Sequence, residues 1–181
     1  MRSQSKPTPM KASISFRSLN RTDLPLLQEW LSAPHVAAWW NDRTDSASIE
    51  AKYGSRIDCG HPTHVFVIEY AQRPIGWIQW YLWADYPEHA QQLGAEPASA
   101  GIDLAIGEAN MTSLGLGPVI IREFLNQFVF TNSEVCAVVA DPDESNVRSL
   151  KAFRKAGFNV VNSVRLAGES SLRKVVRLVR P

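Results

Sequence analysis

Two glycines, one residue apart, mark a possible anion-binding loop in the segment NMTSLGLGPVIIREF, residues 110–124. Gly115 and Gly117 lack a Cβ atom, so consecutive backbone N–H groups can converge there on one point. Pro118 has the φ of a first helical turn and no N–H group, so we expect the following helix to begin there. A helix N-terminus behind such a loop suits phosphate or pyrophosphate, although a ligand-free turn from strand to helix would use the same residues.

A single carboxylate interrupts the apolar segment AGIDLAI, residues 100–106, which has the pattern of a β-strand. Asp103 lies between Ile102 and Leu104, so its side chain faces the surface of the sheet opposite to theirs. A carboxylate in an apolar strand requires a compensating partner. Asp103 can make a structural hydrogen bond to a neighbouring loop, or it can serve as a base beside a reacting group.

The charges are distributed unevenly along the chain, whose formal net charge is +1. Residues 74–121 contain no Lys or Arg but hold five carboxylates, which gives that segment a net charge of −5. The five are Asp85, Glu88, Glu96, Asp103 and Glu108. Such a segment is either a solvated acidic loop or a surface for a cationic ligand. The nearly neutral total gives no support for a nucleic-acid or membrane partner.

The segment DPDESNVRSLKAFRKAGF, residues 141–158, predicts a second helix. Asp143 or Ser145 can cap its start, and Gly157 can end it in the left-handed conformation. Asn146 lies at the exposed start. The basic residues of this helix are Arg148, Lys151, Arg154 and Lys155. They form a solvated basic face, or they meet the anionic end of the ligand that the glycine loop binds.

The remaining patterns predict the elements that hold these groups. Strands are expected over residues 14–19, 65–70, 74–83, 100–106, 134–140, 158–164 and 173–179. A helix capped by Thr22 or Asp23 is expected to carry the apolar residues 26, 27, 30 and 31, and a polar helical stretch is expected over 46–57. With 181 residues, of which 45% are hydrophobic, the chain suits a single mixed α/β domain over 13–181. Residues 1–12 are expected to be a disordered lead-in.

The cysteines and histidines indicate neither a disulfide framework nor a metal site. Cys59 and Cys136 have no metal-ligand spacing, and Cys136 is expected in the core because it lies in the apolar run VCAVV. The histidines form no set typical of a triad or a metal, so we expect no metal. No segment has the length of a transmembrane helix, and with the cysteine usage this predicts a cytoplasmic protein.

Taken together, these motifs resemble the GCN5-related N-acetyltransferase (GNAT) superfamily over residues 14–179. That family has a strand, a glycine-rich loop opening a helix, a strand and a second helix, which correspond here to AGIDLAI, TSLGLG, VCAVVA and SNVRSLKAFRKAGF. The segments FRSLNRTDLPLLQEWLSAPHVAAWW, PIGWIQWY, GIDLAIGEAN and DPDESNVRSLKAFRKAGF are similar to the aminoglycoside 6′-N-acetyltransferases within it. The resemblance implies a mixed, mostly antiparallel sheet with a splayed parallel strand pair, flanked by helices.

The resemblance also implies acetyl-CoA as the donor and the 6′-amine of an aminoglycoside as the acceptor, with direct attack in a ternary complex. Asp103 would be the base, since a protonated amine is not a nucleophile. The cofactor would bind to Ile106, Leu114, Gly115, Leu116, Gly117, Pro118, Asn146 and Phe153. The aminosugar pocket would hold Trp40, Tyr53, Gln79, Tyr81, Glu88 and Asp141. Glu88 would act through its field, and Asp141 is alternatively a plain helix cap.

Two residues depart from the family pattern. Thr112 stands where the family usually has Arg or Gln, which removes one contact to the cofactor. Phe153 stands where a tyrosine often protonates the departing thiolate, and a phenyl ring cannot donate a proton. The thiolate must then leave unaided, take its proton from water or use another group.

Three other functions share much of this pattern. An N-acyltransferase of a siderophore or other small amine would not account for the acidic segment. A protein or peptide N-acetyltransferase would act on peptides, and a non-catalytic acyl-CoA-binding module would be indifferent to loss of the Asp103 charge. The expected assembly is a monomer or a homodimer.

Overall fold

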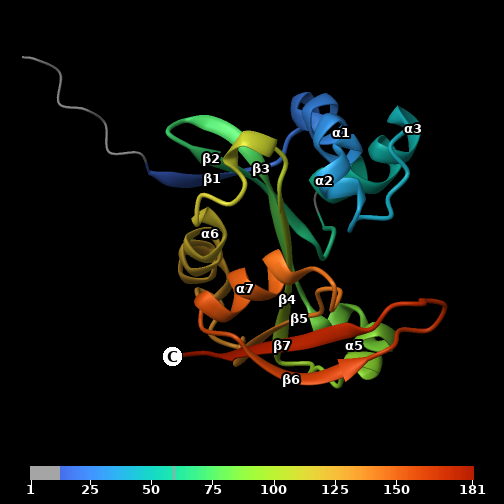
Figure 1. Ribbon diagram of the computed structural model, residues 1–181, viewed down its shortest axis with the longest axis vertical. Helices are drawn as coiled ribbons and strands as arrows, with labels where there is room; N and C mark the ends of the chain where they lie inside the picture. Colours follow the sequence, from blue (N-terminus) through green and yellow to red (C-terminus); the bar gives the residue numbers. More distant parts are fainter. Residues whose placement is uncertain (1–12, 59) are drawn as a thin grey trace, which may run out of the picture.

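The computed structural model describes residues 13–58 and 60–181, and its centre is a seven-stranded sheet of order β1-β2-β3-β4-β5-β7-β6 (Figure 1). The strands are β1 (Ile14–Ser18), β2 (His64–Tyr70), β3 (Arg73–Leu82), β4 (Ser99–Ile106), β5 (Ala137–Ala140), β6 (Asn159–Val164) and β7 (Arg173–Val179). Strands β4 and β5 pair in parallel, and the other neighbours pair antiparallel. The predicted mixed, mostly antiparallel sheet is confirmed. The expected lead-in, residues 1–12, and Cys59 lie outside the described residues.

Helices flank the sheet on both faces. The helices are α1 (Leu24–Ser32), α2 (Pro34–Ala37), α3 (Ser46–Ile49), α4 (Ser55–Ile57), α5 (Pro87–Leu93), α6 (Leu116–Phe124) and α7 (Val147–Lys155). A π-helical turn, Glu50–Gly54, joins α3 to α4, and another, Leu125–Val129, extends α6. Figure 1 shows α6 on the opposite side of the sheet from α1, α2 and α3.

The alternation of side chains along β3 divides the core between the two faces. Ile78 packs with the buried side chains of α6 and α7, such as Phe124 and Phe153. Trp77 packs with α1 on the other face, and Tyr81 packs there with α5. Successive strand residues point to opposite faces, so one strand supplies both layers.

The pairing between β4 and β5 is short. It joins Ser99 to Ala137, Ala100 to Val138 and Gly101 to Val139 and then ends, whereas β4 continues beside β3 to Ile106. The Tyr81 ring lies against Gly101, and a Cβ atom at that position would overlap the ring. The last five residues of β4, 102–106, therefore have no β5 partner along one edge.

The helix starts differ from the sequence-based predictions. Helix α6 begins at Leu116 because Gly115, at φ 77°, turns the chain earlier, and Pro118 falls in the first turn, where its missing N–H is tolerated. Asn146 caps α7 by accepting a hydrogen bond from Ser149 N at 3.1 Å. The two caps predicted there form a local turn instead, in which Ser145 N donates to Asp143 Oδ1 at 2.8 Å.

One element was not predicted, and one residue was placed wrongly. Helix α5 is absent from the predicted elements because only Ala90 and Leu93 anchor it in the core, too few to produce a helical periodicity. Cys136 is exposed although its neighbours Val135 and Ala137 are buried, so its side chain points away from the core in which theirs pack. Its Sγ contacts the carbonyl oxygen of Ala98 at 3.1 Å.

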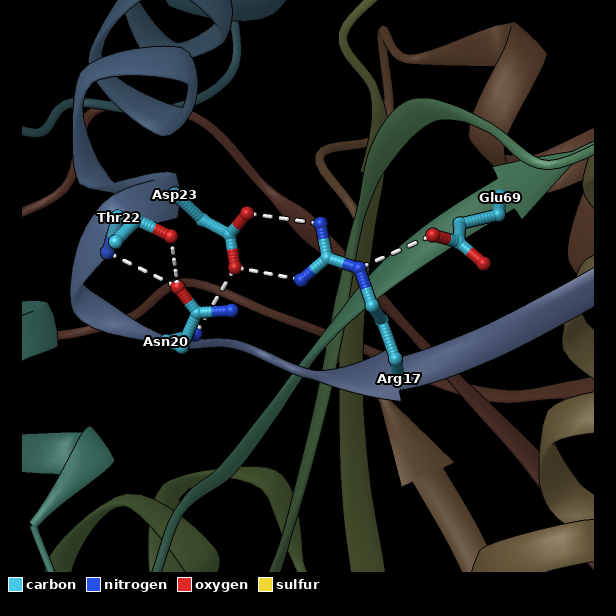
Figure 2. A network of polar contacts seen from close by, with 5 residues as sticks. All are labelled: Arg17, Asn20, Thr22, Asp23 and Glu69. Atoms are coloured by element: carbon cyan, nitrogen blue, oxygen red, sulfur yellow. Dashed lines mark hydrogen bonds and ion pairs between the residues drawn. The ribbon is translucent and has the colours of Figure 1, made fainter.

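A network of polar side chains joins the sheet to the start of α1 (Figure 2). The Arg17 guanidinium donates to both carboxylate oxygens of Asp23, at 2.6 and 2.8 Å, and to Glu69 at 3.0 Å. Asp23 also accepts from Asn20 N at 3.0 Å, and Asn20 Oδ1 accepts from Thr22 N at 2.9 Å, which completes a capping box. Asn20 thus caps the short 3-10 turn Arg21–Asp23 that precedes α1. Of the two predicted caps, Asp23 stands at the N-cap position of α1 but its side chain makes no capping hydrogen bond there, and Thr22 lies within the turn.

Substitution of Asp23 tests this network. Burial raises the pKa of Asp23, but the bonds from Arg17 and Asn20 outweigh it and hold the pKa below its usual range. A lowered pKa stabilises the fold above the unfolded value, about 3.9, and the contribution is lost as pH falls through the folded value. We expect Asp23→Asn to lower the free energy of unfolding by about 1–3 kcal/mol at neutral pH.

The difference between the two proteins should shrink as pH falls from neutral to about 2.5, since below about 3.9 the unfolded chain binds the proton that the native carboxylate resists. Urea unfolding at both pH values measures it. Glu134→Gln, which neutralises an exposed carboxylate, serves as the control. A difference that does not change with pH would contradict the role of the Asp23 charge.

Candidate active site

A cleft of about 420 Å³ opens where β4 and β5 part. Its lining includes seven of the residues predicted from the sequence: Trp40, Gln79, Tyr81, Asp103, Asp141, Asn146 and Phe153. Ile102 and Phe153 belong to the core on the α6 face, whereas Tyr81 belongs to the core on the α5 face. The cleft is therefore lined from both faces of the sheet at the splay.

Asp103 lies in the middle of β4, opposite Gln79 on β3. Gln79 Nε2 donates to Asp103 Oδ2 at 2.8 Å, which leaves Oδ1 for a second partner. Burial and the charge of Asp141 raise the pKa of Asp103, while the bond from Gln79 and the charges of Arg56 and His89 oppose the rise. A carboxylate in this setting is a stronger base than one in water.

Asp141 follows β5 and faces the same cleft. Its carboxylate Oδ2 lies 3.5 Å from His89 Nε2. The neighbouring carboxylate of Asp141 raises the pKa of His89, although burial opposes the rise. Since Asn146 caps α7, the carboxylate of Asp141 is not the helix cap.

The predicted aromatic residues take different positions. Tyr81 lines the cleft, and burial, followed by the charges of Asp103 and Asp141, raises the pKa of its hydroxyl well above the usual value. Trp40 also lines the cleft and packs against Trp77, with ring centroids 5.3 Å apart. Tyr53 is fully buried behind the lining, and its hydroxyl donates to Asp42 at 2.9 Å.

The carboxylates of the acidic segment 74–121 separate in the folded chain. Glu96 pairs with Arg177, and Glu108 accepts a hydrogen bond from Trp30 Nε1, so both are engaged away from the cleft. Asp85 and Glu88 line a neighbouring cavity, with which the cleft shares Tyr86, His89, Leu166 and Glu169. Of the five carboxylates of that segment, Asp103 lines the cleft itself.

Sequence reasoning missed several residues of the cleft. Lys52, Arg56 and Arg173 place positive charge in its wall, beside the carboxylates. His89 is carried by α5, and Pro87 at its start with Gly94 (φ 68°) at its end were the signals for that helix. For Arg56 no local pattern gave a signal, because its contacts are made with β3.

The N-terminus of α6 has the features of an anion site. Ser113 and Gly115 have positive φ values, 62° and 77°, and no side chain of the described residues caps the helix. A Cβ atom on Gly117 would lie 3.2 Å from Ala152 Cβ, so the first turn of α6 packs closely on α7. The backbone N–H groups of this loop and turn fit a pyrophosphate.

The other predicted cofactor residues adjoin this helix and the free edge of β4. Leu114 is exposed, Leu116 and Pro118 lie in the first turn of α6, and the carbonyl oxygen of Ile106 accepts a hydrogen bond from His35 Nε2 at 3.0 Å. On α7, Phe153 packs against Phe158 with ring centroids 5.0 Å apart.

Residues 13–58 and 60–181 hold neither a group of metal ligands nor a membrane-spanning helix. No three or more His, Cys, Asp or Glu side chains of these ranges are arranged to hold a metal ion. None of the helices within them is long and apolar enough to span a bilayer.

Comparison with known proteins reveals several relatives. The chain is 27% identical over 149 residues to an aminoglycoside N(6′)-acetyltransferase type 1 of Klebsiella pneumoniae, which covers 81% of this chain and 74% of that protein. It is 24% identical over 153 residues to the lysine N-acyltransferase MbtK of Mycobacterium tuberculosis, covering 83% and 71%.

Among solved structures, the chain is similar to the aminoglycoside acetyltransferase AAC(6′)-Ib in complex with coenzyme A and kanamycin. The identity is 25%, the TM-score is 0.77, and the match covers 93% of this chain and 95% of that one. A spermidine N-acetyltransferase from Vibrio cholerae, at 17% identity and a TM-score of 0.72, shares the fold.

A family described as the acetyltransferase (GNAT) domain matches residues 20–166, which is most of the chain. This range includes the glycine loop at the start of α6, the splay of β4 from β5, and helix α7. The chain belongs to the GNAT family of acetyltransferases.

Proposed function

We propose that this protein transfers an acetyl group from acetyl-CoA to the 6′-amine of aminoglycosides, by direct attack in a ternary complex. The observation that carries the proposal is the pair of carboxylates, Asp103 and Asp141, in a cleft at the splay of β4 from β5. Relatives named as aminoglycoside 6′-N-acetyltransferases support the choice of acceptor.

Acetyl-CoA supplies the acetyl group as an activated thioester. The uncapped N-terminus of α6, with Leu114, Gly115, Leu116 and Gly117, would hold its pyrophosphate. The edge of β4 beyond Gly101 has no β5 partner and offers backbone groups to an extended chain, in the way that an edge strand accepts a further strand. The carbonyl oxygen of Ile106 at its end is already bonded to His35. Asn146, at the start of α7, borders the same cleft.

Asp103 and Asp141 have different roles toward the acceptor. Asp141 binds an ammonium group of the aminosugar, with the flat ring of Trp40 and the amide of Gln79 nearby in the wall. Asp103 removes the proton from the acceptor ammonium, directly or through water, and the free amine then attacks the thioester. The raised pKa of Asp103 suits this role. Holding the amine in line with the carbonyl supplies much of the remaining rate enhancement.

Phe153 limits the ways in which the departing CoA thiolate can be protonated. Its buried phenyl ring has no proton to give to the departing thiolate. A thiol has a pKa of about 8.5 in water, so a thiolate is a tolerable leaving group at neutral pH without a dedicated acid. The protein must therefore assist removal of the proton from the amine, whereas protonation of the departing sulfur needs less help.

A second candidate is favoured by one observation. Lys52, Arg56 and Arg173 line the cleft beside the carboxylates, so its wall is of mixed charge. Such a wall also suits an amine that carries a carboxylate, as an amino acid does, and one relative is named as a lysine N-acyltransferase.

Replacement of the base is the first functional test. We expect Asp103→Asn to lower kcat by about 10²–10⁴-fold, because the amide cannot take the ammonium proton. Binding of CoA, measured by calorimetry, should persist, since Asp103 is not part of the α6 site. The measurement is CoA release from acetyl-CoA with kanamycin, tobramycin, a siderophore amine precursor or a lysine peptide.

Glu96→Gln is the matched control, because it neutralises a carboxylate of the same segment that pairs with Arg177 outside the cleft. If CoA is released only with the siderophore precursor, or only with the peptide, that compound and not an aminoglycoside is the acceptor. CoA binding without turnover on any amine would support the acyl-CoA-binding module and contradict the enzyme.

The pair of His89 and Asp141 predicts a pH-dependent KM. Protonated His89 competes with the substrate ammonium for Asp141, and Asp141 holds the pKa of His89 above 6.5. As pH rises through that raised value, His89 loses its charge, Asp141 becomes free, and KM for the acceptor should fall.

Measurement of KM from about pH 5.5 to 8.5 in the native protein and in His89→Gln tests this competition. The variant should have the lower KM at acidic pH, and its KM should change less across the range, because glutamine does not titrate. Identical KM profiles for the two proteins would exclude it.

A further inference from the structure

Arg56 occupies a position in the cleft that the mechanism above does not use. It is carried by α4, and its Nη1 donates to Gln79 Oε1 at 2.7 Å. Gln79 Nε2 in turn donates to Asp103 Oδ2 at 2.8 Å. The guanidinium, the amide and the carboxylate thus form a continuous chain of hydrogen bonds that ends at the base.

We propose that Arg56 is a positioning residue, which fixes the orientation of the Gln79 amide and thereby keeps Asp103 oriented and ionised. The inference rests on the proposed function in taking Asp103 as the base. It adds a residue from outside the central sheet to the catalytic apparatus.

The donors and acceptors of the chain permit one arrangement. A guanidinium only donates hydrogen bonds and an ionised carboxylate only accepts them, whereas an amide has one end of each kind. The amide of Gln79 can satisfy both neighbours only with Oε1 toward Arg56 and its NH₂ group toward Asp103. In the flipped orientation, oxygen would face the carboxylate and the NH₂ group would face the guanidinium. Arg56 therefore selects the orientation that serves the base.

Arg56 itself is held on a rigid support. Its guanidinium carbon lies 5.2 Å from the centroid of the Tyr53 ring, a distance typical of a cation–π contact. Tyr53 is fully buried, and its hydroxyl donates to Asp42, which also binds Lys52. No described carboxylate lies within ion-pair distance of Arg56. Its guanidinium therefore bonds to Gln79, and its positive charge acts on Asp103.

The charges around Asp103 oppose one another. Asp141 from the end of β5 disfavours a second negative charge, while Arg56 from α4 and His89 from α5 favour it. The buried hydroxyls of Tyr81 on β3 and of Tyr53 also lie within the field of the Asp103 charge. Loss of Arg56 would remove one of these cations and release the Gln79 donor, and both changes favour the protonated acid.

The experiment is a ¹³C NMR titration of the Asp103 carboxyl in the full chain, with Asp103→Asn for assignment. We expect the apparent pKa of Asp103 to be higher in Arg56→Ala than in the native protein and to return toward the native value in Arg56→Lys. Arg43→Ala is the matched control, because it removes an arginine from the neighbouring surface where Arg43 is 84% exposed. In the Gln79→Leu background, Arg56→Ala should change the pKa less, since the amide that couples the two residues is gone.

Kinetics supply a second readout. With the best acceptor of the panel, Arg56→Ala should lower kcat at neutral pH by about tenfold or more and move the acid limb of the kcat/KM profile to higher pH. The titration needs no turnover, so it tests the inference even if the aminoglycoside assignment fails. Retained CoA binding and an unchanged circular dichroism spectrum show that the variants are folded.

Three results would overturn the inference. An unchanged pKa of Asp103 with a raised acceptor KM would make Arg56 a direct contact to the acceptor. An unchanged pKa with only a lower Tm would make it a packing residue on Tyr53. Equal effects of Arg43→Ala and Arg56→Ala would reduce its role to general surface charge.

Discussion

The end of the pairing between β4 and β5 is the constraint on which the rest of the site depends. The ladder reaches Gly101 and Val139 and stops, and the Tyr81 ring occupies the space beside Gly101 that a side chain would need. Beyond this point β4 follows β3 alone, so its other edge is left without a strand partner. An unpaired edge inside a domain is costly unless something bonds to it, and an extended ligand chain can do so.

Strand alternation then determines what the cleft contains. On β3 and β4, Ile78 and Ile102 point to the face covered by α6 and α7, while Tyr81 points to the face covered by α5. Gln79 and Asp103 are register partners on the two strands, which brings the amide and the carboxylate together. Because the sheet is open at the splay, groups from both faces meet in one cleft. A donor bound at α6 and an acceptor bound near α5 can approach each other there.

The features that suit the site to ligands also leave parts of the fold without internal partners. Helix α6 has Gly115 in place of a capping side chain, and its first N–H groups face the loop. Asp103 and Asp141 bring two negative charges into one cleft, and Arg56 and His89 provide the compensating positive charge. The network of Arg17, Asp23 and Glu69, by contrast, pairs its charges within the fold (Figure 2).

Local patterns are enough to identify the family, the strands and the glycine loop: alternation in residues 100–106, and Gly115 with Gly117 before an apolar helix. The sequence also singles out Asp103, because a carboxylate in an apolar strand is visible without coordinates. The partners of Asp103 came only from the tertiary structure, which brings Arg56 from α4 and His89 from α5 to a strand many residues away. The dispersal of the acidic segment was likewise invisible, because net charge is a sum over residues, whereas pairing such as Glu96 with Arg177 depends on which surfaces meet when the chain folds.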